Sequence, residues 1–438
     1  MRGILSVAAY IPLHRIQWAS GATRAVASYD EDTTTLGVEA GRLALHGRDH
    51  QEIERLLFAT TAPAYVDKNN ASAVHAALGL PPAVTAVDSG GALRSGVGSL
   101  LTALQGGPPT LVVAADMRNG RPGSDDERFG GDASAAVVVG DGDGVVAEFL
   151  GSASTTVELM DRWRLAGETT SHAWEDRFGE SAYLGVVGEV VDAALARAGV
   201  SHDEVRPLVS GAHARAVASV RKTLSANRDG DGDGELTART GHCGAAHGQL
   251  LLVSALEQAE PGQVFALVSL ADGVDVLVFR TTSAITAMRP ALSLRTQLDS
   301  PGQDVTYEKF LSWRGFVTRE PPRRPDPALP AGPPAYRHRH WKFELATGSE
   351  PRRRMSTVHG TVATYTTDHL AHSPSPPTIV AVVDLDGGER RVTELTDVHP
   401  DAVSVGDRVE MTFRRLYTVN GIHNYFWKAR PERLVTES

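Results

Sequence analysis

The stretch Asp88-Ser-Gly-Gly-Ala-Leu-Arg-Ser-Gly96 decides how the chain folds, and the rest of the sequence is organised around it. It follows a short apolar run, 83–87, that is typical of a β-strand, and it precedes a helix-like run, 97–104. A strand that ends in small residues and turns sharply into a helix directs backbone N–H groups and one side chain into a pocket. The side chain at the tip of this turn is Leu93.

Strands and helices alternate on both sides of this turn. The acidic and threonine residues of Asp30-Glu-Asp-Thr-Thr34 are typical of a helix N-terminus, where they cap free N–H groups. Strand-like runs cover 4–11, 53–60 and 111–115, and helical patterns cover 30–45, 69–78, 183–198, 215–224 and 245–260. This alternation predicts an α/β fold with a mostly parallel sheet that is covered on both faces.

Two segments predict antiparallel hairpins instead. Apolar runs 135–139 and 145–149 flank Gly140-Asp-Gly-Asp-Gly144, and apolar runs 264–270 and 274–279 flank Ala271-Asp-Gly273. Glycine and aspartate tolerate the positive φ that tight hairpin turns need. Since each half of the first 280 residues ends in such a hairpin, the sequence predicts the duplication of one α/β unit.

The remaining chain divides into an arm and a β domain. Prolines and arginines are frequent in 285–355, which is typical of an extended arm, and 307–316 is a short helix candidate. Five strand-like runs follow, at 358–366, 378–384, 391–395, 408–416 and 422–428. They predict a small barrel of the OB type. The expected domains are therefore 1–148 and 149–284 for the two halves, 285–355 for the arm and 356–438 for the OB-fold domain.

The composition excludes several classes of function. The 438 residues carry a net charge of -10 with no basic stripe, which disfavours a nucleic-acid partner. Cys243 is the single cysteine, so an intrachain disulfide is excluded and the free thiol fits a reducing cytoplasm. The apolar N-terminal run is interrupted by Pro12, and no run is long enough to cross a bilayer. We expect a cytoplasmic protein with neither a membrane nor a nucleic-acid partner.

Six short motifs in the first 282 residues carry a family resemblance. They are Asp30-Glu-Asp-Thr-Thr34, Asp67-Lys-Asn-Asn70, the turn 88–96, Gly130-Gly-Asp-Ala-Ser-Ala-Ala136, Gly241-His-Cys-Gly-Ala-Ala-His247 and the closing hairpin through Gly273. Together they resemble the thiolase superfamily, with hydroxymethylglutaryl-CoA synthases and ketoacyl-carrier-protein synthase III as the nearest relatives.

The tail resembles a second family. The matching stretches are Tyr307–Arg314, Gly360-Thr-Val-Ala-Thr-Tyr365, Ser373-Pro-Ser-Pro-Pro377 and Asn424-Tyr-Phe-Trp-Lys-Ala-Arg430. They resemble the OB-fold acyl-CoA-associated domain that pairs with thiolase-like proteins. In such relatives a zinc ribbon with paired cysteines often precedes the barrel, but 341–358 contains no cysteine. We therefore expect no metal site there.

The resemblance implies a five-layered αβαβα core of two similar halves, usually a homodimer. It implies an acyl thioester substrate on CoA or on the phosphopantetheine of an acyl carrier protein, and no further cofactor. It implies an oxyanion hole of backbone N–H groups at Leu93 and Gly273. It also implies substrate contacts from Asp67, Lys68 and Arg94. The family triad is a cysteine nucleophile, a histidine, and an asparagine or second histidine.

This sequence departs from the family at the nucleophile. The nucleophile position falls on Leu93, and a leucine cannot attack a thioester, so transfer through a cysteine acyl-enzyme is not available. The backbone N–H groups of the turn could still hold an oxyanion.

The other triad positions are only partly settled by the motifs. Alignment on Arg215 places the family histidine at Ser210, whereas a small register slip makes His213 the match. The third position becomes His242 within Gly241-His-Cys, and other branches of the family also have histidine there. Its imidazole could donate to a thioester carbonyl or enolate oxygen, or take a proton from Cα. We expect Cys243 to be a buried, inert thiol.

A further departure separates the chain from its nearest relatives. Hydroxymethylglutaryl-CoA synthases need a catalytic acid near Thr60-Thr-Ala-Pro-Ala-Tyr65, and this stretch has none. We therefore expect an enzyme that makes or breaks a C–C bond of an acyl thioester, of the aldol or retro-aldol type, through an enolate and without an acyl-enzyme. The alternatives are an acyltransferase that works by direct transfer in a natural-product pathway, and a catalytically inactive thiolase-like subunit.

Overall fold

The structure is a computed structural model. It describes residues 1–18, 21–160, 162–173, 176–224, 232–318, 320, 344–345 and 353–433. Most of the proline-rich part of the predicted arm lies outside these residues.

A nine-stranded sheet forms the centre of the first 281 residues, and the order of its strands is β11-β12-β13-β8-β1-β7-β6-β4-β5. The strands are β1 (Arg2–Tyr10), β4 (Arg55–Thr60), β5 (Thr85–Gly90), β6 (Thr110–Met117), β7 (Asp132–Asp141), β8 (Ala147–Thr156), β11 (Val205–Gly211), β12 (Val264–Leu270) and β13 (Gly273–Thr281). β1 and β8 meet in the middle, where the two halves join.

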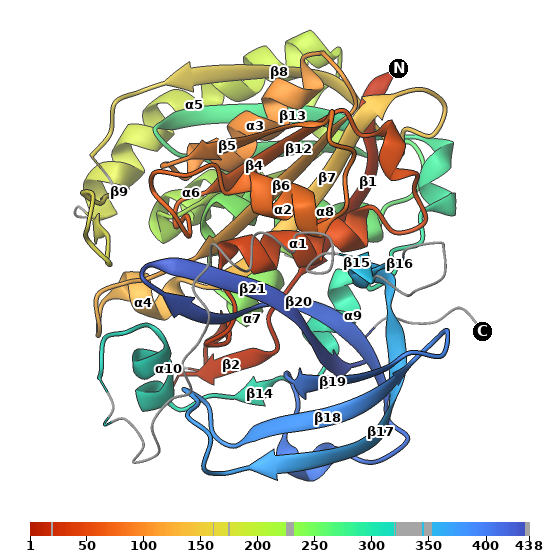
Figure 1. Cartoon of the computed structure of the whole chain (residues 1–438). Helices are drawn as coiled ribbons and strands as arrows, with labels where there is room; N and C mark the ends of the chain where they lie inside the picture. The colour runs from red at the N-terminus through yellow and green to blue at the C-terminus, as the bar shows by residue number, and fades with distance from the viewer. Residues whose placement is uncertain are drawn as a thin grey trace.

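Helices cover both halves of the sheet and also fill the space between them (Figure 1). They are α1 (Thr33–Ala44), α2 (Ala71–Ala77), α3 (Arg94–Leu104), α5 (Asp176–Ala198), α6 (Ala214–Leu224) and α8 (His247–Glu257). α1 and α2 pack on the first half, and α5 and α6 pack on the second half. α3 and α8 contact strands of both halves, so the layers run helix, sheet, helix, sheet, helix. The thiolase-like five-layered fold is confirmed.

The prediction of a mostly parallel sheet is wrong. Among the described strands, β4–β5, β4–β6 and β11–β12 are parallel, whereas the other five neighbouring pairs are antiparallel. Antiparallel pairing follows where the connection is too short for a crossover helix, as between β12 and β13. The sheet is therefore parallel at its two ends and antiparallel in its centre.

One predicted hairpin is confirmed and the other is wrong. β12 and β13 pair directly, with Asp272 at φ 46° and Gly273 at φ 118° in the turn. β7 and β8 do not pair, because β1 lies between them and pairs with both. A local apolar pattern could not reveal this, because the intervening strand comes from the distant N-terminus. The repeat of β12–β13 in the first half is the antiparallel pair β6–β7.

The C-terminal segment is a closed five-stranded barrel, as predicted. Its strands are β17 (His359–Asp368), β18 (Thr378–Leu385), β19 (Arg390–Leu395), β20 (Arg408–Val419) and β21 (Ile422–Pro431), closed in the order β17-β18-β19-β21-β20. Figure 1 shows β20 and β21 running beneath α1, which joins the barrel to the core.

Buried ion pairs fix this junction. Arg430 of β21 lies 2.7 Å from Glu39 of α1 and 2.7 Å from Glu410 of β20. Arg414 of β20 pairs with Glu31 at the start of the core. All five side chains are fully buried or nearly so. A buried charge that loses its partner costs free energy, so these ion pairs hold the barrel against the core.

Shorter elements complete the chain. They are β2 (His14–Gln17), β3 (Thr23–Val26), α4 (Asp125–Phe129), β9 (Arg162–Trp163), β10 (His172–Ala173), α7 (Gly232–Thr240), α9 (Leu294–Asp299), β14 (Gln303–Asp304), α10 (Tyr307–Trp313), β15 (Glu344–Leu345) and β16 (Arg353–Arg354). α10 confirms the predicted short helix in the arm, and β14 pairs with β2.

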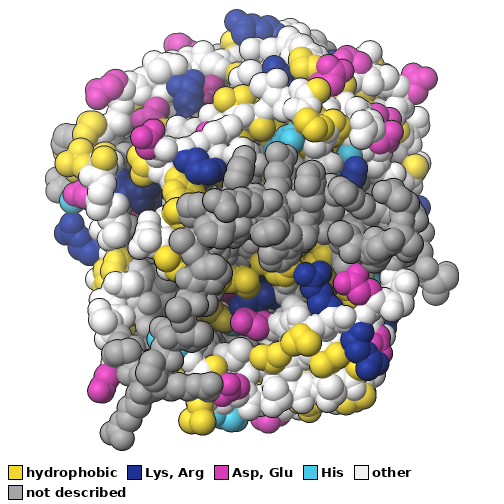
Figure 2. Space-filling view, in the orientation of Figure 1, with side chains coloured by type: hydrophobic (Ala, Val, Ile, Leu, Met, Phe, Trp, Pro, Cys, Tyr) yellow, Lys and Arg dark blue, Asp and Glu magenta, His cyan; other side chains and the backbone are white. Residues whose placement is uncertain are grey.

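The surface carries charges of both signs. On the described part of the face in Figure 2, lysine and arginine side chains alternate with aspartate and glutamate. No helix in the described ranges is long and apolar enough to cross a membrane.

Candidate functional site

Leu93 lies where strand β5 turns into helix α3. Gly91 has φ 102°, which permits the sharp turn, and Leu93 is the residue immediately before the first turn of α3. Gly96 allows α3 to lie close to residues 241–246, because a Cβ on residue 96 would meet the Ala245 carbonyl oxygen at 1.9 Å. The first N–H groups of a helix have no partner within the helix; here the Ser95 and Gly96 N–H groups donate to the Ala92 and Leu93 carbonyls at 3.1 and 3.4 Å, so the donors beside the Leu93 side chain are the N–H groups that precede Ser95.

Leu93 lines a cavity of about 600 Å³, which we call the Leu93 cavity. Its wall draws on the core and on the barrel. It includes Asp32, Thr33, Thr61–Ala64, Val66, Gly91–Leu93, Met117, Asn119, Arg162–Thr169, Ser171, Ala271, Asp272, Arg415 and His423. Residues 60–65, which contain no acidic residue, contribute to this wall. The acidic residues of the wall come from other parts of the chain: Asp32, Glu168 and Asp272.

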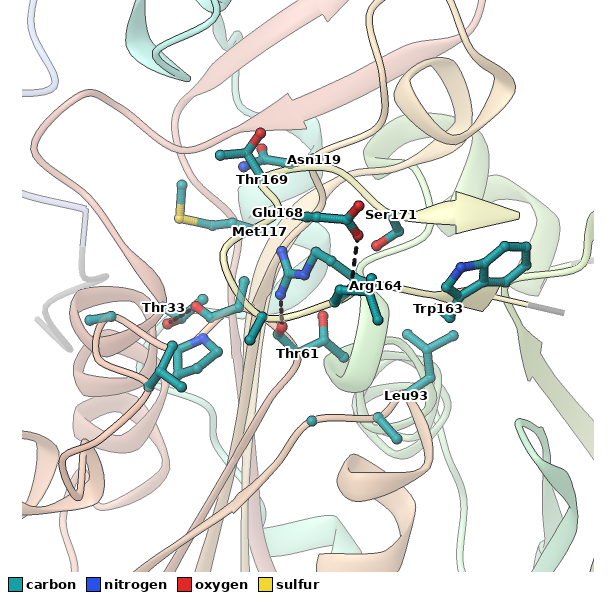
Figure 3. A pocket seen from close by; sticks show the side chains of 18 of the residues that line it. Thr33, Thr61, Leu93, Met117, Asn119, Trp163, Arg164, Glu168, Thr169 and Ser171 are labelled. Atoms are coloured by element: carbon teal, nitrogen blue, oxygen red, sulfur yellow. Dashed lines mark hydrogen bonds between the residues drawn. The ribbon is translucent and has the colours of Figure 1, made fainter. Parts of the chain in front are cut away.

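The segment between β9 and β10 forms one side of the Leu93 cavity. Figure 3 shows Trp163, Arg164 and Glu168 on this segment, opposite Leu93. Arg164 donates to the Thr61 carbonyl oxygen, and Arg162 pairs with Asp126 and donates to Ser171 at 2.8 Å. These bonds hold the segment against the core.

The barrel supplies the other side. Arg415 of β20 donates to the Tyr29 carbonyl oxygen at 3.0 Å and lies 3.7 Å from Asp32. His423 of β21 packs its ring on Tyr65 at 4.9 Å between centroids, and its backbone N–H donates to the Tyr65 hydroxyl at 2.7 Å. Burial, followed by the charge of Arg415, lowers the pKa of His423. His423 is the only imidazole among the described residues that line the Leu93 cavity.

His242 is positioned by a backbone bridge to the end of α4. Its N–H donates to the Phe129 carbonyl at 2.7 Å, and its carbonyl accepts from Gly131 at 3.0 Å. Glycine is required in this bridge, because Gly241 has φ 77° and a Cβ on Gly131 would meet the Thr240 carbonyl oxygen at 1.9 Å. The glycines of the motifs 130–136 and 241–247 therefore allow the two backbone segments to lie this close together.

The hydrogen bonds of His242 define its tautomer. The Gly244 N–H donates to Nδ1 at 3.3 Å, so Nδ1 carries the lone pair and the ring proton resides on Nε2. Burial, then His247, Arg118 and Arg162, hold the pKa of His242 well below its usual range, so the ring is neutral at physiological pH. Nε2 is thus a buried donor, and it has no partner among the described residues.

His242 does not line the Leu93 cavity. It lines a second cavity of about 480 Å³, which we call the histidine cavity, together with His213 and His247. The described part of the wall consists of Ala22, Thr23, Arg118, Asp125, Asp126, Arg128–Gly130, Arg162, Ala173, Val209, Gly211–Ala214, Val217, Ala218, Arg221, Gly234, Thr237, Ala238, Gly241, His242 and His247. Arg162 lines both cavities. Met117 lines the Leu93 cavity, and the next residue, Arg118, lines the histidine cavity.

The structure thus brings together His213 and His242 but places Leu93 in a different cavity. Ser210, at the end of β11, is buried and lines neither cavity. Gly273 follows two residues that line the Leu93 cavity, and a Cβ there would meet the Thr155 carbonyl oxygen at 2.0 Å.

The predicted substrate contacts lie outside both walls. Arg94 is held by Asp275, at 2.8 and 2.9 Å, and by Thr156 and the Asp272 carbonyl, each at 2.8 Å. Asp67 and Lys68 are exposed, and Lys68 donates to Ser72 at 3.2 Å. Their roles as substrate contacts stay predictions.

Cys243 is fully buried, and burial raises the pKa of its thiol to about 12. A thiol in this state is a poor nucleophile. Among the described residues, no group of three or more histidine, cysteine, aspartate or glutamate side chains could hold a metal ion.

Several polar residues that line these cavities are not predicted from the sequence, among them Arg118, Glu168, Arg415 and His423. Arg118 follows a buried strand and could have been noticed there. Glu168 lies on the segment between β9 and β10, and Arg415 and His423 lie on the barrel. No sequence motif places these three residues beside Leu93.

The fold and the turn at Leu93 define the class: a thiolase-like protein with a C-terminal OB-fold domain. The family of ChsH2 C-terminal OB-fold domains matches residues 353–414. The chain is similar in sequence to hydroxymethylglutaryl-CoA synthases. It is 28% identical to the synthase of Pyrococcus furiosus over 291 residues, which cover 62% of this chain and 83% of the synthase. For the synthase of Aeropyrum pernix the identity is 27% over 316 residues, with 66% and 87% covered.

Solved structures show the same fold. MvaS in complex with 3-hydroxy-3-methylglutaryl coenzyme A has a TM-score of 0.59 at 17% identity and covers 74% of this chain and 94% of its own. The curacin pathway HMG synthase in complex with an acetyl donor-ACP has a TM-score of 0.60 at 15% identity, with 72% and 88% covered. The 3-oxoacyl-[acyl-carrier-protein] synthase III of Aquifex aeolicus has a TM-score of 0.55 at 18% identity, with 64% and 100% covered.

Proposed function

We propose that the protein is an enzyme that makes or breaks a C–C bond of an acyl thioester through an enolate, with no acyl group attached to the protein. The proposal is carried by the chemistry of Leu93. This residue at the N-terminus of α3 has an aliphatic side chain, and it lines a cavity of about 600 Å³. The single thiol of the chain, Cys243, is buried elsewhere with a raised pKa.

Homology supports a thioester as the substrate. The relatives are hydroxymethylglutaryl-CoA synthases, and neighbours of the same fold hold a CoA thioester or an acyl carrier protein. We infer that this chain also accepts an acyl group on CoA or on a carrier protein. The donors at the turn of α3 suit the carbonyl oxygen of such a group, where negative charge develops as an enolate forms.

In the retro-aldol direction, a base takes the proton of the β-hydroxyl, the Cα–Cβ bond breaks, and a carbonyl compound leaves. The bonding electrons remain on the thioester as an enolate, which is then protonated at Cα. His423 is the candidate acid and base, because it is an imidazole in the wall of the Leu93 cavity. His242, in the tautomer that the bond from the Gly244 N–H favours, is suited to donate to an oxygen and not to take a proton from Cα.

The test is to incubate the protein with β-hydroxyacyl-CoA, and separately with acyl-CoA and a carbonyl acceptor, and to follow the products and the intact protein by mass spectrometry. We expect cleavage or condensation with no mass added to the protein. An acyl adduct that forms and decays at the rate of turnover would overturn the proposal.

The division of Leu93 and His242 between two cavities favours a second candidate, a catalytically inactive thiolase-like subunit. The variant His423→Ala separates the two candidates. Under the first candidate it lowers turnover by about 10- to 100-fold, because the acid and base of the Leu93 cavity is lost. Under the second candidate no thioester is turned over by either protein, and the chain instead raises the activity of an active homologue added to it.

A further inference from the structure

The histidine cavity holds more hydrogen-bond donors than the described protein uses. Nε2 of His242 is one, as the tautomer shows. Arg118 provides two more, because its Nη2 bonds Asp126 at 2.5 Å while its Nε and Nη1 have no partner among the described residues. His242 is 9% exposed and Arg118 is 3% exposed. Buried donors without acceptors cost free energy, so this pair favours a ligand with acceptor oxygens.

The charge of the cavity favours an anion. Three arginines that line it, Arg118, Arg128 and Arg162, face two carboxylates of the described wall, Asp125 and Asp126. Asp126 is shared by two of the arginines, since it pairs with both Arg118 and Arg162. Burial raises the pKa of Asp126, but the two arginines outweigh it and lower the pKa to about 2. One carboxylate thus balances two guanidinium groups, which leaves positive charge in the wall.

Part of the wall is apolar, and the cavity is open to solvent. Val209, Val217 and several alanines line it, which suits a hydrocarbon body more than a phosphate surrounded by oxygens. Arg128 and Phe129 are each 55% exposed, and Ala214 is exposed, so a ligand can enter from solvent past these side chains.

We propose that the histidine cavity is a binding site for a small organic carboxylate, whose oxygens accept from Arg118 and from His242 Nε2 while its apolar body packs on α6 and β11. This site differs from the Leu93 cavity, and the inference does not depend on the reaction proposed above.

The test uses the full-length protein and two matched pairs of probes: butyrate with butyramide, and benzoate with benzamide. Binding is measured by titration calorimetry at constant ionic strength, and no thioester is present. We expect the carboxylates to bind at least tenfold more tightly than the amides of the same shape, because the neutral amides cannot use the positive charge of the wall.

Three variants locate the site. Arg118→Met should weaken carboxylate binding at least tenfold, and Ala214→Trp should do the same by filling the mouth. Because Ala214 is exposed, its variant does not disturb buried packing. Ala196→Trp, at an exposed position of α5 outside the cavity wall, should bind as the native protein does. Equal binding of acid and amide, no binding of either acid, or full binding by Ala214→Trp would overturn the proposal, whereas failure of the thioester assays would not affect it.

Discussion

The Leu93 cavity and the histidine cavity share Arg162, yet they offer a ligand different surroundings. The wall of the Leu93 cavity contains both hydrogen-bond acceptors and donors, because it includes three acidic residues, Asp32, Glu168 and Asp272, and three arginines. In the histidine cavity, three buried donor atoms of Arg118 and His242 have no partner among the described residues, against one such acceptor, Asp126 Oδ2, and burial lowers the pKa of His242 and of His247. A mixed wall suits a long polar substrate and proton transfer, whereas a donor-rich wall suits an anion that binds and stays charged.

The two cavities also differ in what holds them together. Among the described residues, those that line the histidine cavity all belong to the core, from Ala22 to His247. The wall of the Leu93 cavity also includes Arg415 and His423 of the barrel, so it is complete on that side only while the barrel is docked. Four predictions break or sharpen this comparison.

The largest effect is expected from Arg430→Met. This change leaves Glu39 and Glu410 buried with Arg42 as their remaining partner, at 3.0 and 3.5 Å. Loss of one member of a buried charged cluster lowers the free energy of unfolding by about 3–5 kcal/mol. We expect thermal and chemical denaturation to show this loss, together with weaker thioester binding and unchanged carboxylate binding. Arg390→Met is the control, because Arg390 lies on the same barrel in an exposed pair with Asp384 and should change little.

Leu93→Cys tests the tip of the turn directly. A thiol placed at the N-terminus of α3 is expected to have a pKa below the usual 8.5 and to react readily with iodoacetamide. The native protein should react far more slowly, because its only thiol, that of Cys243, is buried. We expect a labelling rate about 100-fold higher for the variant, as measured by mass spectrometry. If the two proteins react at the same rate, Leu93 is not at an accessible tip.

Much of this comparison could be read from the sequence, and part of it could not. The turn 88–96 and the barrel strands were predictable because local patterns of apolar residues and glycine define them. The insertion of β1 between β7 and β8 was not, since pairing with a strand more than 100 residues away leaves no local pattern. The same limit applies to the site: Gly241-His-Cys marks His242, but nothing near it shows that His242 and Leu93 lie in different cavities.

His423→Ala tests which cavity carries proton transfer. Removal of the only imidazole among the described residues of the Leu93 cavity should lower turnover of a thioester by about 10- to 100-fold, the usual contribution of a general acid or base. Carboxylate binding in the histidine cavity should not change. His399→Ala is the matched control, because His399 is an exposed barrel histidine that lines neither cavity. Equal turnover of the two variants would assign the acid and base role to another residue.

The smallest effect is expected from Glu257→Gln, at the end of α8 away from both cavities. Burial raises the pKa of Glu257 to about 7, although the Leu294 and Arg295 N–H groups counteract it. Because this pKa lies above the 4.5 of the unfolded chain, ionisation in the folded protein costs free energy, and stability decreases as the pH rises from 4.5 through 7. The glutamine variant avoids this cost and keeps an acceptor for the Leu294 N–H. We expect it to be more stable than the native protein by about 1 kcal/mol at pH 8 and equal to it at pH 4.5, as measured by urea denaturation. A change in carboxylate binding or in turnover would show that α8 transmits changes from this end to His247 at the other, and that the histidine cavity is less independent than its wall suggests.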